Sequence, residues 1–264
     1  MSYLFRDTEL AARRLRVLAD VYAPTSRAFL EAVVTNTPQI AVDLGCGPGY
    51  TTRLLSEVTA CKQAVGIDAS KYFLSLARQD APQHISFLSH DVTQVPFPIE
   101  QIDLIYCRFL LTHLQDPQRI IERWSTQLAP QGLLLVEEAE WIESEQPAFS
   151  TYLSIVAAML EQQANQLYIG PILAAMPVAT GLSKKMSRVY RYPVATKQAA
   201  TMFSMNIPAW KQQPFIQQRY GLSMIERLEQ ELLSLAATST VTGEITWGMR
   251  QIAYERIDEA SPLQ

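Results

Sequence analysis

One short stretch of the sequence could bind a ligand through its backbone. Residues 42–50 read Val-Asp-Leu-Gly-Cys-Gly-Pro-Gly-Tyr, an acid followed by three glycines at every second position. Glycine lets the chain turn sharply and bring its N–H groups close to a ligand. In the dinucleotide pattern G-x-G-x-x-G the third glycine would fall at Tyr50, and Pro48 removes an amide that a pyrophosphate would use. The stretch therefore predicts a ligand-binding turn of another type, with an ordinary strand-to-helix turn as the alternative.

Two acids stand where the next two strands are expected to end. Asp68 follows the apolar run 64–67, and Asp91 lies shortly after the run 85–88. An acid at the end of the second strand of a nucleotide-binding α/β fold can accept hydrogen bonds from both ribose hydroxyls. A helix N-cap is the alternative role for Asp68, but Ser70 suits that role better because it lies nearer to the expected helix.

The pattern Asp-x-Gly-x-Gly-x-Gly at the start of a helix resembles the first motif of the class I (Rossmann-like) S-adenosylmethionine-dependent methyltransferases. The resemblance implies S-adenosyl-L-methionine as cofactor, and no metal is expected. In the family pattern a carboxylate at Asp91 accepts a hydrogen bond from the adenine amino group, and the N–H of Val92 binds the ring. Arg108 would meet the methionine carboxylate or a structural acid. The cofactor-binding residues expected from this match are Asp43, Gly45, Cys46, Gly47, Gly49, Asp68, Ala69, Asp91, Val92, Cys107 and Arg108.

Few side chains need to take part in such chemistry. Methyl transfer from a sulfonium is an in-line displacement, and holding acceptor and methyl in line can supply much of the acceleration. A base is needed only when the acceptor arrives protonated. His113 and Glu138 are the candidate catalytic residues, with Glu137 and Glu140 as alternatives. A packed or capping histidine is the favoured account of His113, and an acid near Glu138 could also bind an acceptor amine or balance the sulfonium charge.

A sheet must position these residues. Apolar runs and helical periods alternate from Ile40 to Glu138, which predicts a parallel sheet with helices on both faces. The segment 97–102 is too short for a helix, and two helices are expected before the sheet, over 8–22 and 24–33. Together with the resemblance, this predicts a doubly wound α/β fold. Its seven-stranded sheet is mostly parallel with the last strand antiparallel, and a helical lid is inserted around the last two strands.

The second half of the chain differs in character from the first. We expect N-terminal helices and the cofactor-binding core in 1–146, a helical lid in 147–181, a core strand in 182–196, a second lid segment in 197–240, and the last core strand and tail in 241–264. Both lid segments are expected to cover the methyl donor. Methionine and aromatic residues in them could form the core of a helical unit or line an apolar acceptor pocket. The aromatic candidates for such a pocket are Tyr152, Tyr168, Phe203 and Trp210.

Composition narrows the class of protein. The 264 residues carry a formal net charge of −4, which argues weakly against a dedicated nucleic-acid binder. No run reaches the ~18 apolar residues of a membrane span, and the first ten residues lack the apolar core of a signal peptide. The three cysteines show no metal or redox spacing. We expect a cytoplasmic protein without nucleic-acid or membrane partners, acting on a small-molecule acceptor as a monomer or homodimer.

The sequence thus predicts a methyltransferase that uses S-adenosylmethionine and acts on an O, N or C atom of a small molecule. The large lid and the lack of an appended nucleic-acid module favour an enzyme of secondary metabolism. One alternative is methylation of a protein or RNA, which an open basic groove would favour. Another is a protein that binds S-adenosylmethionine without transferring methyl, as a sensor or a scaffold for a cyclisation. The glycine spacing disfavours a nicotinamide oxidoreductase.

Overall fold

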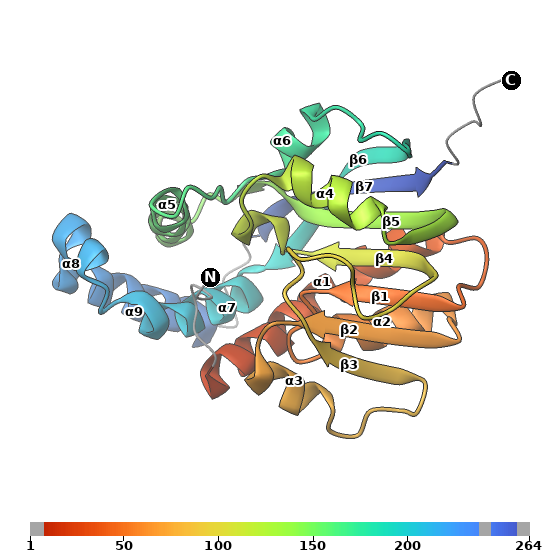
Figure 1. The fold of residues 1–264 in the computed structure, drawn as a ribbon. Coiled ribbons are helices and arrows are strands. Elements are labelled where there is room, and N and C mark those ends of the chain that lie inside the picture. Colours follow the sequence, from red (N-terminus) through yellow and green to blue (C-terminus); the bar gives the residue numbers. More distant parts are fainter. Residues whose placement is uncertain (1–7, 238–243, 258–264) are drawn as a thin grey trace, which may run out of the picture.

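A seven-stranded sheet forms the centre of the molecule. The computed structural model describes residues 8–237 and 244–257, and its strands lie side by side in the order β3-β2-β1-β4-β5-β7-β6 (Figure 1). β7 runs antiparallel to its neighbours β5 and β6, and the remaining pairs are parallel. The predicted fold class is confirmed. The strands are β1 (Ile40–Leu44), β2 (Gln63–Asp68), β3 (Ile85–Ser89), β4 (Ile102–Arg108), β5 (Leu128–Glu143), β6 (Leu182–Ala195) and β7 (Glu244–Arg256).

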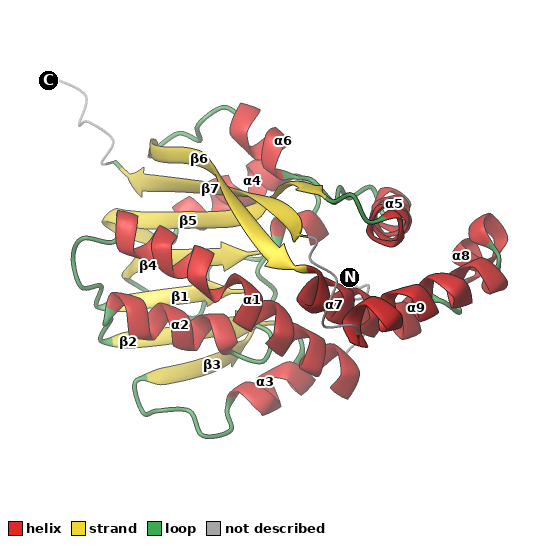
Figure 2. Cartoon of the chain, turned by 180° about the vertical axis from the view of Figure 1, so that it is seen from behind, coloured by secondary structure: helices red, strands yellow, loops and turns green. Residues whose placement is uncertain are grey.

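The parallel strands are apolar on both faces, as strands covered by helices on two sides must be. Ala41, Val42 and Leu44 of β1 are all fully buried. Ala41 packs in the core under α1 (Glu9–Val33) and α2 (Tyr50–Thr59), whereas Val42 and Leu44 pack in the core under α4 (Pro117–Ser125) and α6 (Gly170–Ala175). Figure 2 shows α1 and α2 on the near face of the sheet and α4 and α6 behind it.

Side-chain caps begin two of the helices, and Ser70 lies where the sequence predicts one. Ser70 caps α3 (Lys71–Ala77) by accepting a hydrogen bond from Phe73 N, and Asp116 caps α4 by accepting one from Arg119 N. A short 3-10 helix, η1 (Leu111–His113), follows β4. Residues 90–101, between β3 and β4, contain no helix, as expected for so short a connection.

A single helix, α1, runs past Pro24, so the predicted division into two helices is wrong. A proline inside a helix removes a backbone hydrogen bond and costs about 3 kcal/mol. Both halves of α1 are nevertheless held by burial against the rest of the protein, since Tyr22 before the proline is 1% exposed and Phe29 after it is fully buried. The adjacent Thr25 and Ser26 are also buried and hydrogen-bond to Glu137 of β5.

Four helices pack together beyond the carboxyl ends of the parallel strands, at the left of Figure 1. We call them the helical cluster: α5 (Pro147–Glu161), α7 (Thr196–Trp210), α8 (Pro214–Tyr220) and α9 (Leu222–Ala237). Its core is aromatic: Tyr152 stacks on Phe203 with ring centroids 4.1 Å apart, Phe149 meets Phe203 edge-on at 5.4 Å, and Trp210 is fully buried. Tyr22 of α1 and Trp247 of β7 join this core.

The chain after residue 146 consists of helices separated by the strands β6 and β7. α5 and α6 lie within 147–181, β6 ends at Ala195, and α7 to α9 occupy 196–237. Residues 238–243 and 258–264, which belong to the expected second lid segment and tail, lie outside the described part of the chain. Within the described residues, no helix combines the length and the apolar character that crossing a membrane would require.

Candidate active site

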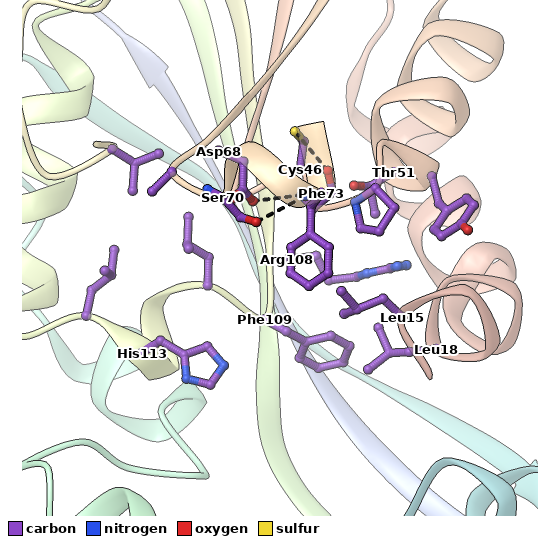
Figure 3. Close-up of a pocket in the computed structure, with 18 of the residues that line it drawn as sticks. Leu15, Leu18, Cys46, Thr51, Asp68, Ser70, Phe73, Arg108, Phe109 and His113 are labelled. Atoms are coloured by element: carbon purple, nitrogen blue, oxygen red, sulfur yellow. Dashed lines mark hydrogen bonds between the residues drawn. The ribbon is translucent and has the colours of Figure 1, made fainter. Parts of the chain in front are cut away.

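A cavity of about 990 Å³ lies at the carboxyl ends of β1 to β4. Small-molecule sites usually measure about 300–1,000 Å³, so this cavity has room for a nucleoside ligand and a second small molecule. Figure 3 shows His113 on one side and Leu15 and Leu18 of α1 on the other, with Arg108 and Phe109 between them. Four lining residues come from α1 and two follow α5, and the rest lie in 45–115. The cavity therefore belongs to the α/β core and α1.

The glycine turn faces this cavity through Gly47. All three glycines have positive φ, but their surroundings differ. A Cβ at Gly45 would lie 2.8 Å from the Leu110 side chain, and one at Gly49 would lie 2.7 Å from Phe87. Among the described residues, a Cβ at Gly47 would meet nothing closer than Leu15, at 3.6 Å, so it would project into the space where a ligand fits. Gly45, Cys46 and Gly47 line the cavity, whereas the structure places Gly49 against the core.

Asp43, expected to bind the cofactor, holds the turn from behind. It is 1% exposed and accepts hydrogen bonds from the hydroxyls of Thr51, at 2.6 Å, and Thr52, at 2.7 Å. Burial raises the pKa of the Asp43 carboxyl to about 6. Because α2 has no side-chain cap of its own, these bonds fix its first turn relative to β1. The two adjacent threonines after the glycines were the sequence signal for this supporting role.

Asp68 connects the second strand to the glycine turn. One carboxylate oxygen accepts the N–H of Gly47 at 2.8 Å, and the other accepts the N–H of Ser70 at 2.7 Å. A carboxylate offers about four acceptor positions, so Asp68 can hold the turn and still accept ribose hydroxyls. Asp68 and Ala69 both line the cavity, where the sequence predicts a nucleoside.

Asp91 and Val92 line the cavity beside Asp68. Asp91 accepts hydrogen bonds from the N–H and the hydroxyl of Thr93, and the N–H bond lowers the pKa of the Asp91 carboxyl below its ordinary value. The carbonyl of Val92 accepts the indole N–H of Trp124 at 2.8 Å, which fixes this segment against α4. The two residues predicted to contact adenine are therefore held in a defined conformation.

Arg108 and Cys107 end β4 and point to opposite faces, as neighbours in a strand do. Arg108 is 8% exposed, lines the cavity, and donates a hydrogen bond to Ser26 Oγ at 2.8 Å. In the described part of the chain no carboxylate oxygen lies within 4.0 Å of its guanidinium. Cys107 packs in the core under α4 and does not reach the cavity. A buried guanidinium at a cavity suits an anionic group on a ligand.

Comparison with known proteins agrees with this geometry. Residues 42–136, which span the glycine turn and the strands around it, match the family model described as a methyltransferase domain. Residues 42–136 therefore match a methyltransferase domain, and the fold around them is that of the class I methyltransferases. A candidate methyltransferase of Bacillus halodurans shares the fold over 89% of this chain and 100% of that one, with a TM-score of 0.60 and 15% identity.

Two further similar proteins carry names that refer to different reactions. The trans-aconitate 2-methyltransferase of Yersinia pestis is 36% identical over 134 residues, which are 51% of this chain and 47% of that enzyme. The chain thus matches about half the length of this relative. The cyclase SpnF shares the fold over 89% of this chain and 81% of that one, with a TM-score of 0.54 and 18% identity. A class I fold therefore occurs in proteins named for different reactions.

His113, predicted as a base or a packed residue, lines the cavity from η1. Burial, and then the charge of Arg14, lowers the pKa of its imidazole to about 4. The ring is therefore uncharged near neutral pH and is a weak base. It can contact an acceptor, but it is poorly suited to removing a proton from a hydroxyl or an ammonium group.

The structure does not bring Glu138 to the cavity. The side chain is fully buried, and its Oε1 accepts the backbone N–H groups of Leu110 and Leu111, each at 2.7 Å. Burial raises the pKa of the Glu138 carboxyl to about 8. Glu138 thus holds the backbone of the turn that carries His113 by hydrogen bonds, without lining the cavity itself. Of the alternatives, Glu140 forms an ion pair with Arg250 at 2.5 Å, and Glu137 belongs to a buried network described below.

Sequence reasoning missed several lining residues and assigned too many to the lid. Leu15, Leu18, Phe73 and Phe109 line the cavity through apolar contacts that leave no motif in the sequence. From the described parts of the two expected lid segments, only Gln163 and Asn165 reach the lining, and both come from the first. The aromatic candidates for an acceptor pocket do not line the cavity. Tyr152, Phe203 and Trp210 are at most 6% exposed, because they pack against one another in the core of the helical cluster.

Proposed function

We propose that this protein transfers a methyl group from S-adenosylmethionine to a small organic carboxylate. The observation that carries the proposal is the inward-facing Gly47, beside Asp68 and Asp91, in one cavity of about 990 Å³. The match of residues 42–136 to a methyltransferase domain supports the reaction. The carboxylate class draws on the name of the Yersinia pestis relative, trans-aconitate 2-methyltransferase.

The residues at the cavity fit the parts of S-adenosylmethionine. Asp68 would accept the ribose hydroxyls, and Asp91 with the N–H of Val92 would meet the adenine. Backbone at Gly45 and Gly47 would lie against the amino-acid part, where Arg108 would pair with the carboxylate. S-adenosylmethionine supplies a methyl group activated by a sulfonium. A carboxylate oxygen of the acceptor forms a bond to the methyl carbon as the carbon–sulfur bond breaks, and the bonding pair stays on sulfur, giving a neutral thioether and a methyl ester.

A carboxylate acceptor fits the absence of a good base at the cavity. At neutral pH a carboxylate is already deprotonated, so its methylation needs no proton transfer. The imidazole in the described lining is that of His113, and its pKa of about 4 makes it a weak base. The cationic side chains of the described lining belong to Arg14 and Arg108; with Arg108 assigned to the donor, the charge of Arg14 favours an anionic acceptor over an ammonium.

The test combines binding with product detection. Calorimetric titration should give one S-adenosylmethionine site per chain, and Gly47→Val should remove it. Incubation with methyl-labelled S-adenosylmethionine and a panel of di- and tricarboxylic acids, including trans-aconitate, should yield S-adenosylhomocysteine and a labelled methyl ester by mass spectrometry. A labelled amine or phenol from a parallel panel, without any ester, would refute the carboxylate class. Binding without S-adenosylhomocysteine formation on every panel, including peptides and RNA, would favour a non-methylating protein.

A further inference from the structure

One buried carboxylate fastens α1 to three strands directly beside the cavity. Glu137 of β5 is fully buried, and a buried carboxylate is costly unless hydrogen bonds compensate it. It accepts bonds from four side chains: Ser26 Oγ at 2.5 Å, Tyr106 OH at 2.9 Å, Gln251 Nε2 at 2.7 Å, and the hydroxyl of Thr25. These donors come from α1, β4 and β7, so Glu137 joins elements that are far apart in the sequence.

Glu137 is also the cross-strand neighbour of Arg108. The two charges could form an ion pair, but no nitrogen of Arg108 lies within 4.0 Å of a carboxylate oxygen in the described structure. The four donors occupy Glu137 instead. Within the described residues the side-chain hydrogen bond of the guanidinium is the one to Ser26, so its other N–H groups can serve a ligand in the cavity, while the nearby negative charge still stabilises the buried cation.

Ser26 connects the two charged groups. A serine hydroxyl has one proton and two acceptor positions. Because the proton of Ser26 goes to Glu137, its lone pairs are directed toward other donors: Arg108 Nη1 donates to Ser26 Oγ at 2.8 Å, and Tyr106 OH, which also contacts Glu137, lies 2.9 Å from it. The orientation of the hydroxyl, and with it the anchored edge of the guanidinium, is thus set by the carboxylate. Pairing of a planar guanidinium with a carboxylate depends on such orientation.

We propose that Glu137 is a positioning residue, which acts through Ser26 to direct Arg108 toward the carboxylate of the methyl donor. The inference rests on the proposed function, because it requires the donor to lie in this cavity. It predicts that the network affects recognition of the amino-acid part of the donor and leaves recognition of the nucleoside unchanged. A network that only stabilised the fold would affect both parts alike.

Two ligands separate these possibilities. S-adenosylhomocysteine carries the carboxylate, whereas 5′-methylthioadenosine keeps the nucleoside and sulfur but lacks the amino-acid part. We expect Ser26→Ala to weaken S-adenosylhomocysteine binding by about ten-fold and 5′-methylthioadenosine binding by less than about two-fold, measured by calorimetry. Glu137→Gln should give a selective loss in the same direction, because the amide has no negative charge and one acceptor oxygen where the carboxylate has two.

Thr25→Ala is the matched control. Thr25 is as fully buried as Ser26 and donates to the same carboxylate, but in the described structure Ser26, and not Thr25, bonds to Arg108. We expect Thr25→Ala to lower the melting temperature about as much as Ser26→Ala and to weaken S-adenosylhomocysteine binding clearly less. If Glu137→Gln does not fold, the Ser26 and Thr25 pair still decides the question.

The possible results separate the two proposals. Equal losses for both ligands in Ser26→Ala, or no loss for either, would overturn the positioning role while wild-type binding upholds the donor site. Wild-type protein that binds neither ligand would overturn the proposed function, and this inference with it.

Discussion

The α/β core and the helical cluster both bury apolar side chains, but only the core side of the molecule also buries charged ones. In the described residues, Asp43, Arg108, Glu137 and Glu138 are at most 8% exposed, as is Arg14 of α1. In the helical cluster the buried polar residues are uncharged, as in the hydrogen bond from Asn206 Nδ2 to Tyr152 OH at 2.6 Å. The two regions therefore differ in what their interiors contain.

This difference indicates a division of roles. A buried charge is costly, so it persists where hydrogen bonds compensate it and where a site uses it. The charges of the core gather around the cavity, under the glycine turn, at the end of β4 and in the neighbouring part of β5. The helical cluster is packed by stacked aromatic rings such as Tyr152 and Phe203 and supplies no residue to the described lining from α7, α8 or α9. We expect the core to determine donor binding and the cluster to determine stability.

The largest effect should come from Gly47→Val. With φ at +51°, Gly47 sits where a side chain is strained, and a valine there would also fill the ligand space. We expect no measurable S-adenosylmethionine binding by calorimetry. Gly221→Val is the matched control in the cluster, since Gly221 has φ +76° and open space around it. The control should lose similar stability and keep its affinity; equal loss of affinity in both would break the division.

The reverse experiment removes a ring from the helical cluster. Phe203 is 6% exposed and contacts Tyr152, Phe149 and Trp247. Phe203→Ala should lower the free energy of unfolding by about 3–5 kcal/mol, because the cavity left behind adds to the lost burial. Donor affinity of the folded fraction should change by less than about two-fold. Denaturant unfolding and calorimetry on the same preparation would measure both, and a large fall in affinity would mean that the cluster shapes the donor site.

Smaller losses are expected from the two nucleoside acids. Asp91→Ala and Asp68→Ala should each weaken the binding of S-adenosylmethionine and of S-adenosylhomocysteine. The expected loss of binding free energy is about 1.5–3 kcal/mol, the range for a hydrogen bond to a charged group. The two ligands should lose equally, because neither acid is placed to contact the methyl group. Asp68→Ala should also lower stability, since the acid holds Gly47 N. Unequal losses in titrations with the two ligands would place one acid near the sulfur.

Much of the core could be predicted because its signals are local. Alternating strands and helices, the cap at Ser70, and the acids after β2 and β3 follow from short stretches of sequence and from where parallel sheets bind ligands. The glycine turn was found in the same way. The different roles of its glycines could not be found in this way. Gly49 packs against Phe87 and Gly47 faces Leu15, and both of these neighbours come from other elements.

The features that sequence reasoning missed depend on distant contacts. α1 continues through Pro24, and directly after the proline Thr25 and Ser26 donate hydrogen bonds to Glu137, more than 100 residues away in the sequence. The supporting place of Glu138 depends on the path of the turn after β4. In the same way, amphipathic helices rich in aromatic residues look alike whether they surround an acceptor or one another. Only the packing of Phe203 shows that these rings face one another.

The smallest effect should come from His113, the polar group on the cavity wall opposite α1. Its pKa of about 4 lies below the ordinary value of 6.5, so the folded protein binds fewer protons at this site between those pH values. Its contribution to stability is therefore lost as pH falls from about 6.5 to 4, and above pH 6.5 it should cause no pH dependence of turnover. A true general base usually contributes 10²–10⁴-fold to the rate.

His113→Asn should accordingly lower kcat by less than about ten-fold, raise the acceptor KM, and leave donor affinity unchanged within about two-fold. His84→Asn, on a histidine that contacts Ser56 and does not line the cavity, is the control and should change none of these. Steady-state kinetics from pH 5 to 9 would measure the effect. If His113→Asn instead removed 100-fold or more of kcat with folding and donor binding intact, proton transfer would dominate. The acceptor would then arrive protonated, and the carboxylate class would have to be given up.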